Sequence, residues 1–407
     1  MNRKLPLLSL IAIIIFTAAP AAKCQWIQTS GPSNPDLITV NVASIGSTLF
    51  AGTTDGVYRS TDDGANWIQV DSGVPTDYAN VLVTNGMDLY LGTDAAGGLY
   101  RSTDSGASWK NLNVTNTGVN AILVSGSTIF AGTALQGFKV STNGGTSWTT
   151  VGSFGTTAVW DFATLGSYLF AATDGYGILV SNDNGATWQT SNPGLNNVHL
   201  ERLTVMGPNI FAGTSPGTNS GVYLSTNNGG NWTSVSTGLP NDYVYGLAAS
   251  GTNLFAAIGA QNSANGGIYL TTNRGQSWKV ENIGMTGIDS IGSPCVHVAG
   301  TKLYTGGVGV WKRPLSDFAG AGVASASRDM TPIDVYPNPT SGLVTVRYSV
   351  EGAAHVTVAN LLGEIMMEPD VPSASGFTLD LSKLPAGAYF VEISSERSVV
   401  RKMVVKE

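Results

Sequence analysis

Side chains that could hold or transform a ligand occur in the loops that join short apolar strands of a repeated pattern. These candidates combine aromatic rings, carboxylates, one arginine and one histidine: Asp77, Tyr78, Trp160, Asp161, His199, Arg202, Asp242, Tyr243 and Tyr245. Aromatic faces beside carboxylates suit a sugar or a peptide. Two carboxylates could also hydrolyse a glycosidic bond, although the spacing singles out no pair. We therefore expect binding without catalysis, with glycoside hydrolysis as the alternative.

Tyr78 and Tyr243 have a second interpretation. They end the repeat variants GVPTDY and GLPNDY, so they would equally serve to brace similar loops. Other polar residues of the same kinds of loop join the candidates: Asp55, Asp94, Asp174, Tyr176, Glu201 and Asp289.

The sequence carries no pattern for a metal or a cofactor. His199, His297 and His355 are too scattered for a recognisable metal motif, and phosphate-binding loops and nucleophile elbows are absent. Cys295 lies in an alternating strand pattern and is expected to be a buried core thiol.

The elements that position these residues come from an internal repeat. The octapeptide ending at Trp67 returns five times along the chain, ending at Trp109, Trp148, Trp188, Trp232 and Trp278. Steps of about forty residues between similar units are typical of propellers and solenoids, because one unit cannot bury its own apolar face.

Each repeat predicts four short strands. The second strand is the clearest, and it occurs seven times as variants of LFAGT, whereas the octapeptide occurs six times. Trp26-Ile27-Gln28 copies Trp67-Ile68-Gln69, so the N-terminal segment is expected to complete the last sheet and leave no free edge. We predict an all-β fold, a seven-bladed propeller over residues 25–317, with an open solenoid as the alternative.

The octapeptide itself predicts a hairpin clamp. Its Asp or Asn bonds turn backbone, its Gly supplies a positive φ, and its Trp packs between sheets while the ring N–H finds a partner. The residues concerned are Asp62, Trp67, Asp104, Trp109, Asn143, Trp148, Asp183, Trp188, Asn227, Trp232, Asn273 and Trp278. Asn in half of these positions argues against calcium ligation. The pattern resembles the Asp-box or BNR repeat of sialidases, xyloglucanases, sortilin-type receptors and photosystem assembly factors.

That resemblance implies a fold rather than an activity. In a four-stranded blade, the loops between strands two and three share a face with the blade-to-blade loops, opposite the Asp boxes. A sialidase would need three arginines at this mouth, and only Arg202 is placed there. A xyloglucanase-type site needs a cleft between two propellers, and this sequence predicts a single propeller.

Composition and the N-terminus indicate an exported protein. Residues 1–24 contain Arg3 and Lys4 before an apolar run too short for a comfortable membrane span. Cleavage after Cys24 is expected; cleavage after Ala22 and acylation of Cys24 are alternatives. The net charge of −7 and pI near 5.0 argue against nucleic-acid binding.

The repeated sequence pattern ends after Asp317. Residues 318–331 have the composition of a linker, and residues 332–407 predict a small Ig-like β-sandwich. Four strings occur in order: YPNP from Tyr336, LGE from Leu362, LPAGAY from Leu384 and RKMVVK from Arg401. They resemble the C-terminal sorting domain of type IX secretion cargo. The resemblance implies a Bacteroidota-type bacterium, Sec export, contact with the type IX machinery, and then release or attachment to surface lipopolysaccharide. An adhesive sandwich left in place is the alternative.

Overall fold

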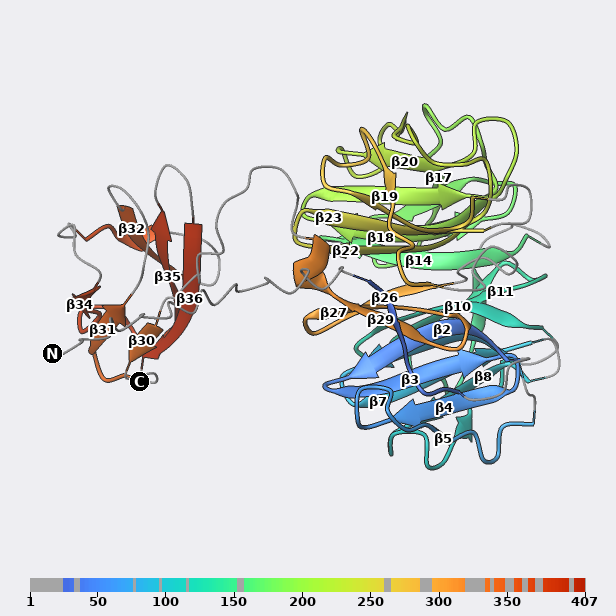
Figure 1. The fold of residues 1–407 in the computed structure, drawn as a ribbon, viewed down its shortest axis with the longest axis horizontal. Coiled ribbons are helices and arrows are strands. Elements are labelled where there is room, and N and C mark those ends of the chain that lie inside the picture. Colours follow the sequence, from blue (N-terminus) through green and yellow to red (C-terminus); the bar gives the residue numbers. More distant parts are fainter. Residues whose placement is uncertain are drawn as a thin grey trace, which may run out of the picture. The chain divides into compact units, whose positions relative to one another are not determined.

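A computed structural model describes two compact units, Met1–Gly320 and Ala321–Glu407. The described residues are 25–32, 37–75, 78–94, 97–114, 117–151, 157–259, 265–285 and 295–318 in the first unit, and 334–336, 340–347, 355–360, 365–369, 376–394 and 399–406 in the second. They are almost entirely strands and turns (Figure 1). The predicted export signal, residues 1–24, lies outside them.

The described part of the first unit forms seven antiparallel sheets, which we number in chain order. Their first strands are β2 (Ile38–Ile45), β6 (Ala79–Asn85), β10 (Val119–Ser125), β14 (Val159–Leu165), β18 (Leu200–Met206), β22 (Val244–Ser250) and β26 (Val296–Ala299). Their second strands are β3 (Thr48–Thr53), β7 (Asp88–Thr93), β11 (Thr128–Thr133), β15 (Tyr168–Thr173), β19 (Asn209–Thr214), β23 (Asn253–Ile258) and β27 (Lys302–Thr305).

The outer half of each sheet is shorter. The third strands are β4 (Gly56–Ser60), β8 (Leu99–Ser102), β12 (Phe138–Ser141), β16 (Ile178–Ser181), β20 (Val222–Ser225), β24 (Gly267–Thr271) and β29 (Trp311–Pro314). The fourth strands are β5 (Ile68–Gln69), β9 (Lys110–Asn111), β13 (Thr149–Val151), β17 (Gln189–Thr190), β21 (Thr233–Ser234), β25 (Lys279–Val280) and, in sheet 7, β1 (Ile27–Gln28). A short strand β28 (Gly307–Val308) adds to the inner edge of sheet 1 by pairing with β2.

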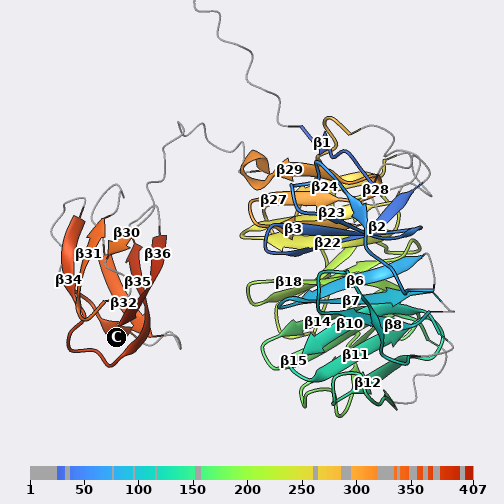
Figure 2. The same cartoon turned by 90° about the horizontal axis from the view of Figure 1, so that it is seen from below.

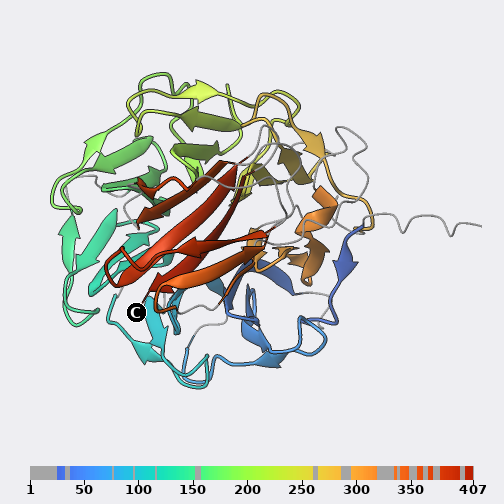
Figure 3. The same ribbon diagram turned by 90° about the vertical axis from the view of Figure 1, so that its left-hand side faces the viewer.

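The sheets follow one another around a central axis. Each first strand contacts the first strand of the next sheet, and β26 contacts both β22 and β2. The sequence colours accordingly run once around the unit (Figure 3). The second strands are buried on both faces because each lies between neighbouring sheets, which explains their continuous apolar run.

Small residues in the second strands let the sheets approach closely. A Cβ on Gly92 would lie 2.5 Å from the Val119 carbonyl oxygen of the next first strand. A Cβ on Gly213 would lie 2.5 Å from the Val244 side chain in the same way. Gly at these two positions therefore permits close packing of neighbouring sheets, whereas sheets 4 and 6 carry Ala at the equivalent position, Ala172 and Ala257.

The octapeptide turns form the clamp that the sequence predicts. In the first of them, Asp62 Oδ1 accepts the Asn66 N–H at 2.8 Å, and Ser60 Oγ accepts the Gly64 N–H at 2.8 Å. The equivalent pair of bonds occurs in the other five turns. Side-chain and backbone hydrogen bonds lower the pKa of Asp104 and of Asp183 to about 2. Two successive residues, such as Asp63 and Gly64, adopt positive φ in each turn.

Most of the repeated tryptophans tie one sheet to the preceding one. The ring N–H donates to a backbone carbonyl at the outer strand of the neighbouring sheet in Trp109, Trp148, Trp232, Trp278 and Trp26. Trp188 donates instead to Gly185 of its own turn. The expectation of a partner fails at Trp67, whose buried Nε1 has none among the described residues.

The N-terminal segment completes sheet 7, as the copied Trp-Ile-Gln predicts. β1 pairs with β29, with Ile27 opposite Lys312 (Figure 2). Trp26 is 2% exposed and its Nε1 donates to the Glu281 carbonyl at 2.6 Å. Phe318, placed by sequence at the start of the linker, is buried against Trp26 at the end of a short 3-10 helix, η2 (Leu315–Phe318).

A charged cluster joins sheet 7 to sheet 1. Asp63 Oδ2 lies 2.5 Å from Lys302 Nζ and 2.6 Å from Lys312 Nζ, and the Tyr304 hydroxyl donates to Asp63 Oδ1 at 2.6 Å. Although partial burial opposes the effect, the hydrogen bonds and the Lys312 charge lower the pKa of Asp63 to about 2. This contact reinforces the closure of the ring.

We expect Asp63→Asn to lower the free energy of unfolding at pH 7 by about 1 kcal/mol, since the carboxylate is partly exposed and solvent screens it. Because the folded-state pKa lies below the unfolded value of 3.8, the contribution is present above about pH 4 and is lost as pH falls towards 2. Denaturant unfolding of both proteins at pH 7 and pH 2.5 checks this. An equal difference at the two pH values would contradict it.

The described part of the second unit contains two sheets around one core. One contains β30 (Asp334–Tyr336), β31 (Leu343–Arg347) and β34 (Gly376–Asp380). The other contains β32 (His355–Asn360), β33 (Ile365–Met367), β35 (Gly387–Ser394) and β36 (Val399–Lys406). Val346, Val358 and Val391 are fully buried between them. The Tyr389 hydroxyl donates to the Pro385 carbonyl at 2.8 Å and fixes the LPAGAY turn.

Candidate functional site

A β-bulge near the start of six first strands shapes one end of the central channel. The register against the second strand shifts at the same place in sheets 1 to 6. The extra residues are Val40, Asn80, Asn120, Trp160, Glu201 and Tyr245. Bulges re-aim side chains and are frequent beside functional sites.

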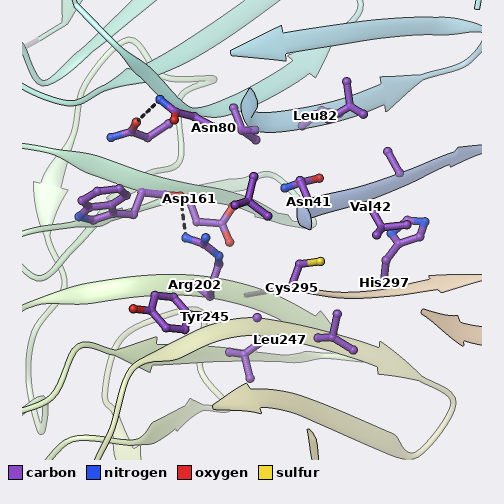
Figure 4. A pocket seen from close by; sticks show the side chains of 18 of the residues that line it. Asn41, Val42, Asn80, Leu82, Asp161, Arg202, Tyr245, Leu247, Cys295 and His297 are labelled. Atoms are coloured by element: carbon purple, nitrogen blue, oxygen red, sulfur yellow. Dashed lines mark hydrogen bonds between the residues drawn. The ribbon is translucent and has the colours of Figure 1, made fainter. Parts of the chain in front are cut away.

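All six bulge residues line one cavity of about 880 Å³, which we name the mouth cavity. Its other lining residues are Ile38, Tyr78, Asp174, His199, Arg202, Ser215, Pro216 and Tyr243. A narrower channel of about 300 Å³ shares Trp160, Arg202 and Tyr245 with it and continues along the first strands to Cys295 and His297 (Figure 4). The mouth cavity therefore opens into the centre of the ring.

The aromatic part of the mouth cavity comes from sheets 4 and 6 and the loop before β6. The rings of Tyr243 and Tyr245 stack with centroids 5.1 Å apart and planes 9° from parallel. Trp160 lines the same cavity, and Tyr78 lies at its rim with 41% of its surface exposed. Stacked rings present a flat apolar face to a ligand.

The polar part is built by backbone-anchored side chains of sheets 4 and 5. Arg202 donates from one guanidinium nitrogen to the Glu201 carbonyl at 2.7 Å. The same nitrogen donates to the Trp160 carbonyl at 3.4 Å (Figure 4). Ser215 donates its hydroxyl to Glu201, and His199 pairs with Asp174 across two neighbouring loops. These bonds hold the charged groups in fixed positions.

Asp161 lies below the mouth cavity, in the channel. Its two oxygens accept the backbone N–H of Phe162 at 2.8 Å and of Leu203, in the next sheet, at 2.9 Å. Burial raises the pKa of Asp161 to about 6, although the nearby Arg202 charge lowers it. The carboxylate therefore links β14 to β18 within the ring.

A pair of amides faces the charged residues across the mouth. Asn80 donates its side-chain amide to Asn120 Oδ1 at 3.1 Å. The amide nitrogen of Asn120 is buried and has no hydrogen-bond partner among the described residues. An unpaired amide donor in this state can donate a hydrogen bond to a carbonyl or hydroxyl oxygen of a ligand.

The deeper channel holds groups of low reactivity. Burial raises the pKa of the Cys295 thiol to about 12 and lowers the pKa of His297 to about 4. Cys295 is a buried thiol, as the alternating strand predicts. His297 Nε2 lies 3.0 Å from Ser44 Oγ.

The structure brings most of the candidates together. Six line the mouth cavity: Tyr78, Trp160, His199, Arg202, Tyr243 and Tyr245. Asp161 lines the channel below. Asp242 is fully buried, and its Oδ1 accepts the Tyr243 N–H. Asp77 lies outside the described residues, as does Asp289.

The sequence does not point to Asn80, Asn120 or Ser215, which line the mouth cavity. Asp174 and Glu201, which the sequence gives as further polar candidates, line it as well. A constant distance along the sequence from the second strand identifies the bulge residues. Each precedes the fourth residue of its LFAGT-type strand by twelve positions, as Trp160 precedes Ala172 and Asn120 precedes Gly132. The same offset in sheet 7 falls on Pro294, outside the described residues.

Comparison with known families identifies the tail. Residues 334–407 match the family described as the secretion system C-terminal sorting domain. The tail is a type IX sorting domain. It marks the chain for export to the cell surface or beyond.

Among the described residues, no helix has the length and apolar character needed to cross a membrane, and no group of His, Cys, Asp or Glu side chains could hold a metal.

Solved structures similar to this chain include β-propellers, at low sequence identity. The GH74 enzyme of Niastella koreensis has 19% identity and a TM-score of 0.50, covering 68% of this chain and 43% of that one. The extracellular domain of the putative one-component system BT4673 from B. thetaiotaomicron has 12% identity and a TM-score of 0.56, covering 94% and 59%. YCF48 bound to D1 peptide has 13% identity and a TM-score of 0.52, covering 75% and 99%.

These likenesses establish a β-propeller fold for the first unit, which we now call the propeller. The chain spans less than two thirds of the length of the GH74 enzyme and of the BT4673 domain. Comparison with curated proteins gives no match.

Proposed function

We propose that this protein is an exported, closed seven-bladed propeller of Asp-box repeats that binds a glycan or protein ligand at the mouth cavity without turnover. Closure is supported by the pairing of β1 with β29 and by the contact of β26 with β2. The Asp-box assignment is supported by the clamp hydrogen bonds that recur in the six octapeptide turns.

The observation that carries the proposal is the ring of bulge residues. Six sheets each turn one extra side chain towards the same cavity. The repeats preserve the bulge, but the residue it presents differs in most sheets, from Val40 through Asn80 to Trp160 and Tyr245. A uniform backbone with varied, inward-facing side chains is the arrangement of a recognition surface on a rigid scaffold.

The sorting tail supports the rest of the proposal. We infer Sec export through residues 1–24, recognition of residues 332–407 by the type IX machinery, and then release or attachment to surface lipopolysaccharide. Outside the cell, the propeller would act as a binding or scaffold module.

Glycoside hydrolysis, of an atypical exo-sialidase-like kind, is the second candidate, because the raised pKa of Asp161 suits a general acid. Two observations weigh against it. Both carboxylate oxygens of Asp161 already accept backbone N–H groups. Arg202 is the one arginine that lines the mouth cavity within the described part of the chain, where a sialidase would use three.

We expect Trp160→Ala to weaken ligand binding by about 30-fold, the loss typical of a central aromatic anchor. Glycan and peptide arrays on the purified protein find ligands, and titration of the strongest one compares the variants. Tyr176→Ala is the matched control, since Tyr176 is an exposed ring on a loop of the same sheet that does not line the cavity.

Two results would contradict the proposal. Equal loss in both variants, or none in Trp160→Ala, would place the site elsewhere. Release of sugar from a bound glycan, abolished by Asp161→Asn, would make the protein a hydrolase.

A further inference from the structure

Glu201 is a buried carboxylate that forms no ion pair with any described residue of the propeller. Its surface is 7% exposed, and it lines the mouth cavity. Among the described residues, the Glu201 carboxylate accepts one side-chain hydrogen bond, from the neutral Ser215 hydroxyl. A neutral hydroxyl does not compensate its charge. A carboxylate removed from water without a cation is costly, so a ligand that brings a positive charge would relieve that cost.

The neighbouring arginine does not provide this charge by direct pairing. Arg202 points one guanidinium nitrogen at two backbone carbonyls, those of Glu201 and Trp160. Asp161 lines the channel with Arg202, and the Arg202 charge acts on that carboxyl. Asp174, at the rim, pairs with His199. The three carboxylates of the mouth and channel therefore outnumber the one arginine. The resulting negative charge of the cavity attracts cationic ligands and repels anionic ones.

Aromatic rings stand beside Glu201. Burial, then the nearby Tyr243 and Glu201, raise the pKa of the Tyr245 hydroxyl above its usual value, so Glu201 is close enough to act on this ring. Tyr243 stacks on Tyr245 in sheet 6, and Trp160 of sheet 4 lines the same cavity. The faces of such rings attract an ammonium or guanidinium group, and they also pack against the aliphatic stem that carries it.

We propose that the mouth cavity binds the basic side chain of a peptide, a lysine or arginine whose charged head pairs with Glu201 while its stem packs on Trp160 and the Tyr243–Tyr245 pair. This inference rests on the proposed function and specifies its ligand. Six first strands each contribute a lining residue to the cavity, so it suits a side chain that enters from the mouth better than a sugar chain that runs across. The free amide N–H of Asn120 is available to a carbonyl of the same peptide.

The test uses five defined probes on the purified protein. Four are blocked pentapeptides of glycine with Lys, Arg, Gln or Glu at the centre, and the fifth is the glucosamine trimer, which carries amines on a sugar. Calorimetric titration gives their affinities for the wild type, Glu201→Gln and Asp94→Asn. Glu201→Gln keeps an acceptor for Ser215, and Asp94→Asn removes an equal charge on the same face from a residue that does not line the cavity.

We expect the Lys and Arg peptides to bind at least about tenfold more tightly than the Gln and Glu peptides, and Glu201→Gln to lose about 10–100-fold while Asp94→Asn loses little. Added salt should weaken binding to the wild type more than to Glu201→Gln. Equal binding of the Lys and Gln peptides, or an unchanged affinity in Glu201→Gln, overturns the inference. Binding of the glucosamine trimer in preference to the peptides overturns the peptide assignment, and failure of every probe to bind overturns it as well. In those cases the array titration with Trp160→Ala still decides the proposed function separately.

Discussion

Trp26→Ala should lower the free energy of unfolding of the propeller by about 3–5 kcal/mol, the cost of truncating a buried tryptophan. Trp26 is 2% exposed and packs with Phe255, Leu303 and Phe318, which belong to sheet 6, sheet 7 and η2. Its ring N–H would also be lost, leaving the Glu281 carbonyl without that donor. Because Trp26 precedes β1 directly, its loss should loosen the closing strand first.

Thermal and denaturant unfolding measure this loss of stability. We expect Tm to fall by around 10 °C, because a given loss of free energy shifts Tm less in a large domain than in a small one. Trp67→Ala is the matched control, because Trp67 occupies the corresponding place in sheet 1 but is half-buried, and its ring N–H has no partner within the described part of the chain. Its cost should be smaller. Equal costs for the two variants would mean that the closing segment is no more important than any other outer strand.

The sequence predicts the repeated part of the fold because the repeat shows each local rule several times. The LFAGT strands, the octapeptide turns and the copied Trp26-Ile27-Gln28 lie in the structure where the pattern places them. β28 was not foreseen, since Gly307-Val308 is too short to carry a pattern and pairs only where sheets 7 and 1 meet. The sequence places Phe318 in the linker because its neighbours are small and polar, whereas tertiary contacts bury it.

The site was less predictable than the fold. The sequence pattern places Trp160, Asp161, Arg202 and Tyr245 in loops, whereas the structure places them in β14, β18 and β22, at or beside the bulges.

The sequence also does not indicate how deeply each side chain lies. Tyr243 and Asp242 are adjacent in the chain. One lines the mouth cavity and the other turns inward to cap its own backbone. The pairing of Asn80 with Asn120 depends on two bulges forty positions apart, and a bulge is a backbone irregularity that residue type alone does not signal.

Arg313→Met is the second change from which we expect a large effect, about 3–5 kcal/mol of stability, because it would leave a buried acid without its cation. Arg313 is 3% exposed, its Nη1 lies 3.0 Å from Glu281 Oε2, and its Nε lies 3.4 Å from Asp317 Oδ2. The guanidinium also stacks over Phe318, 4.3 Å from the ring centroid. Lys279 contacts Glu281 as well, but its side chain is 64% exposed and cannot fully replace the buried charge.

A Glu281→Met and Arg313→Met double variant should recover much of the lost stability, since removing both charges of a buried pair is often nearly neutral. A double variant no more stable than Arg313→Met would show that packing, rather than the unpaired charge, causes the loss.

The two large predictions meet at Glu281, whose side chain pairs with Arg313 and whose backbone carbonyl accepts the Trp26 N–H. Residues that share a partner are expected to couple, so the costs of Trp26→Ala and Arg313→Met should not add. We expect the double variant to lose less than the sum by about 1 kcal/mol or more, because either change alone already loosens the same corner between sheets 6 and 7. A double-mutant cycle measured by denaturant unfolding tests this. Strict additivity would mean that the N-terminal strand and the buried ion pair stabilise the ring independently.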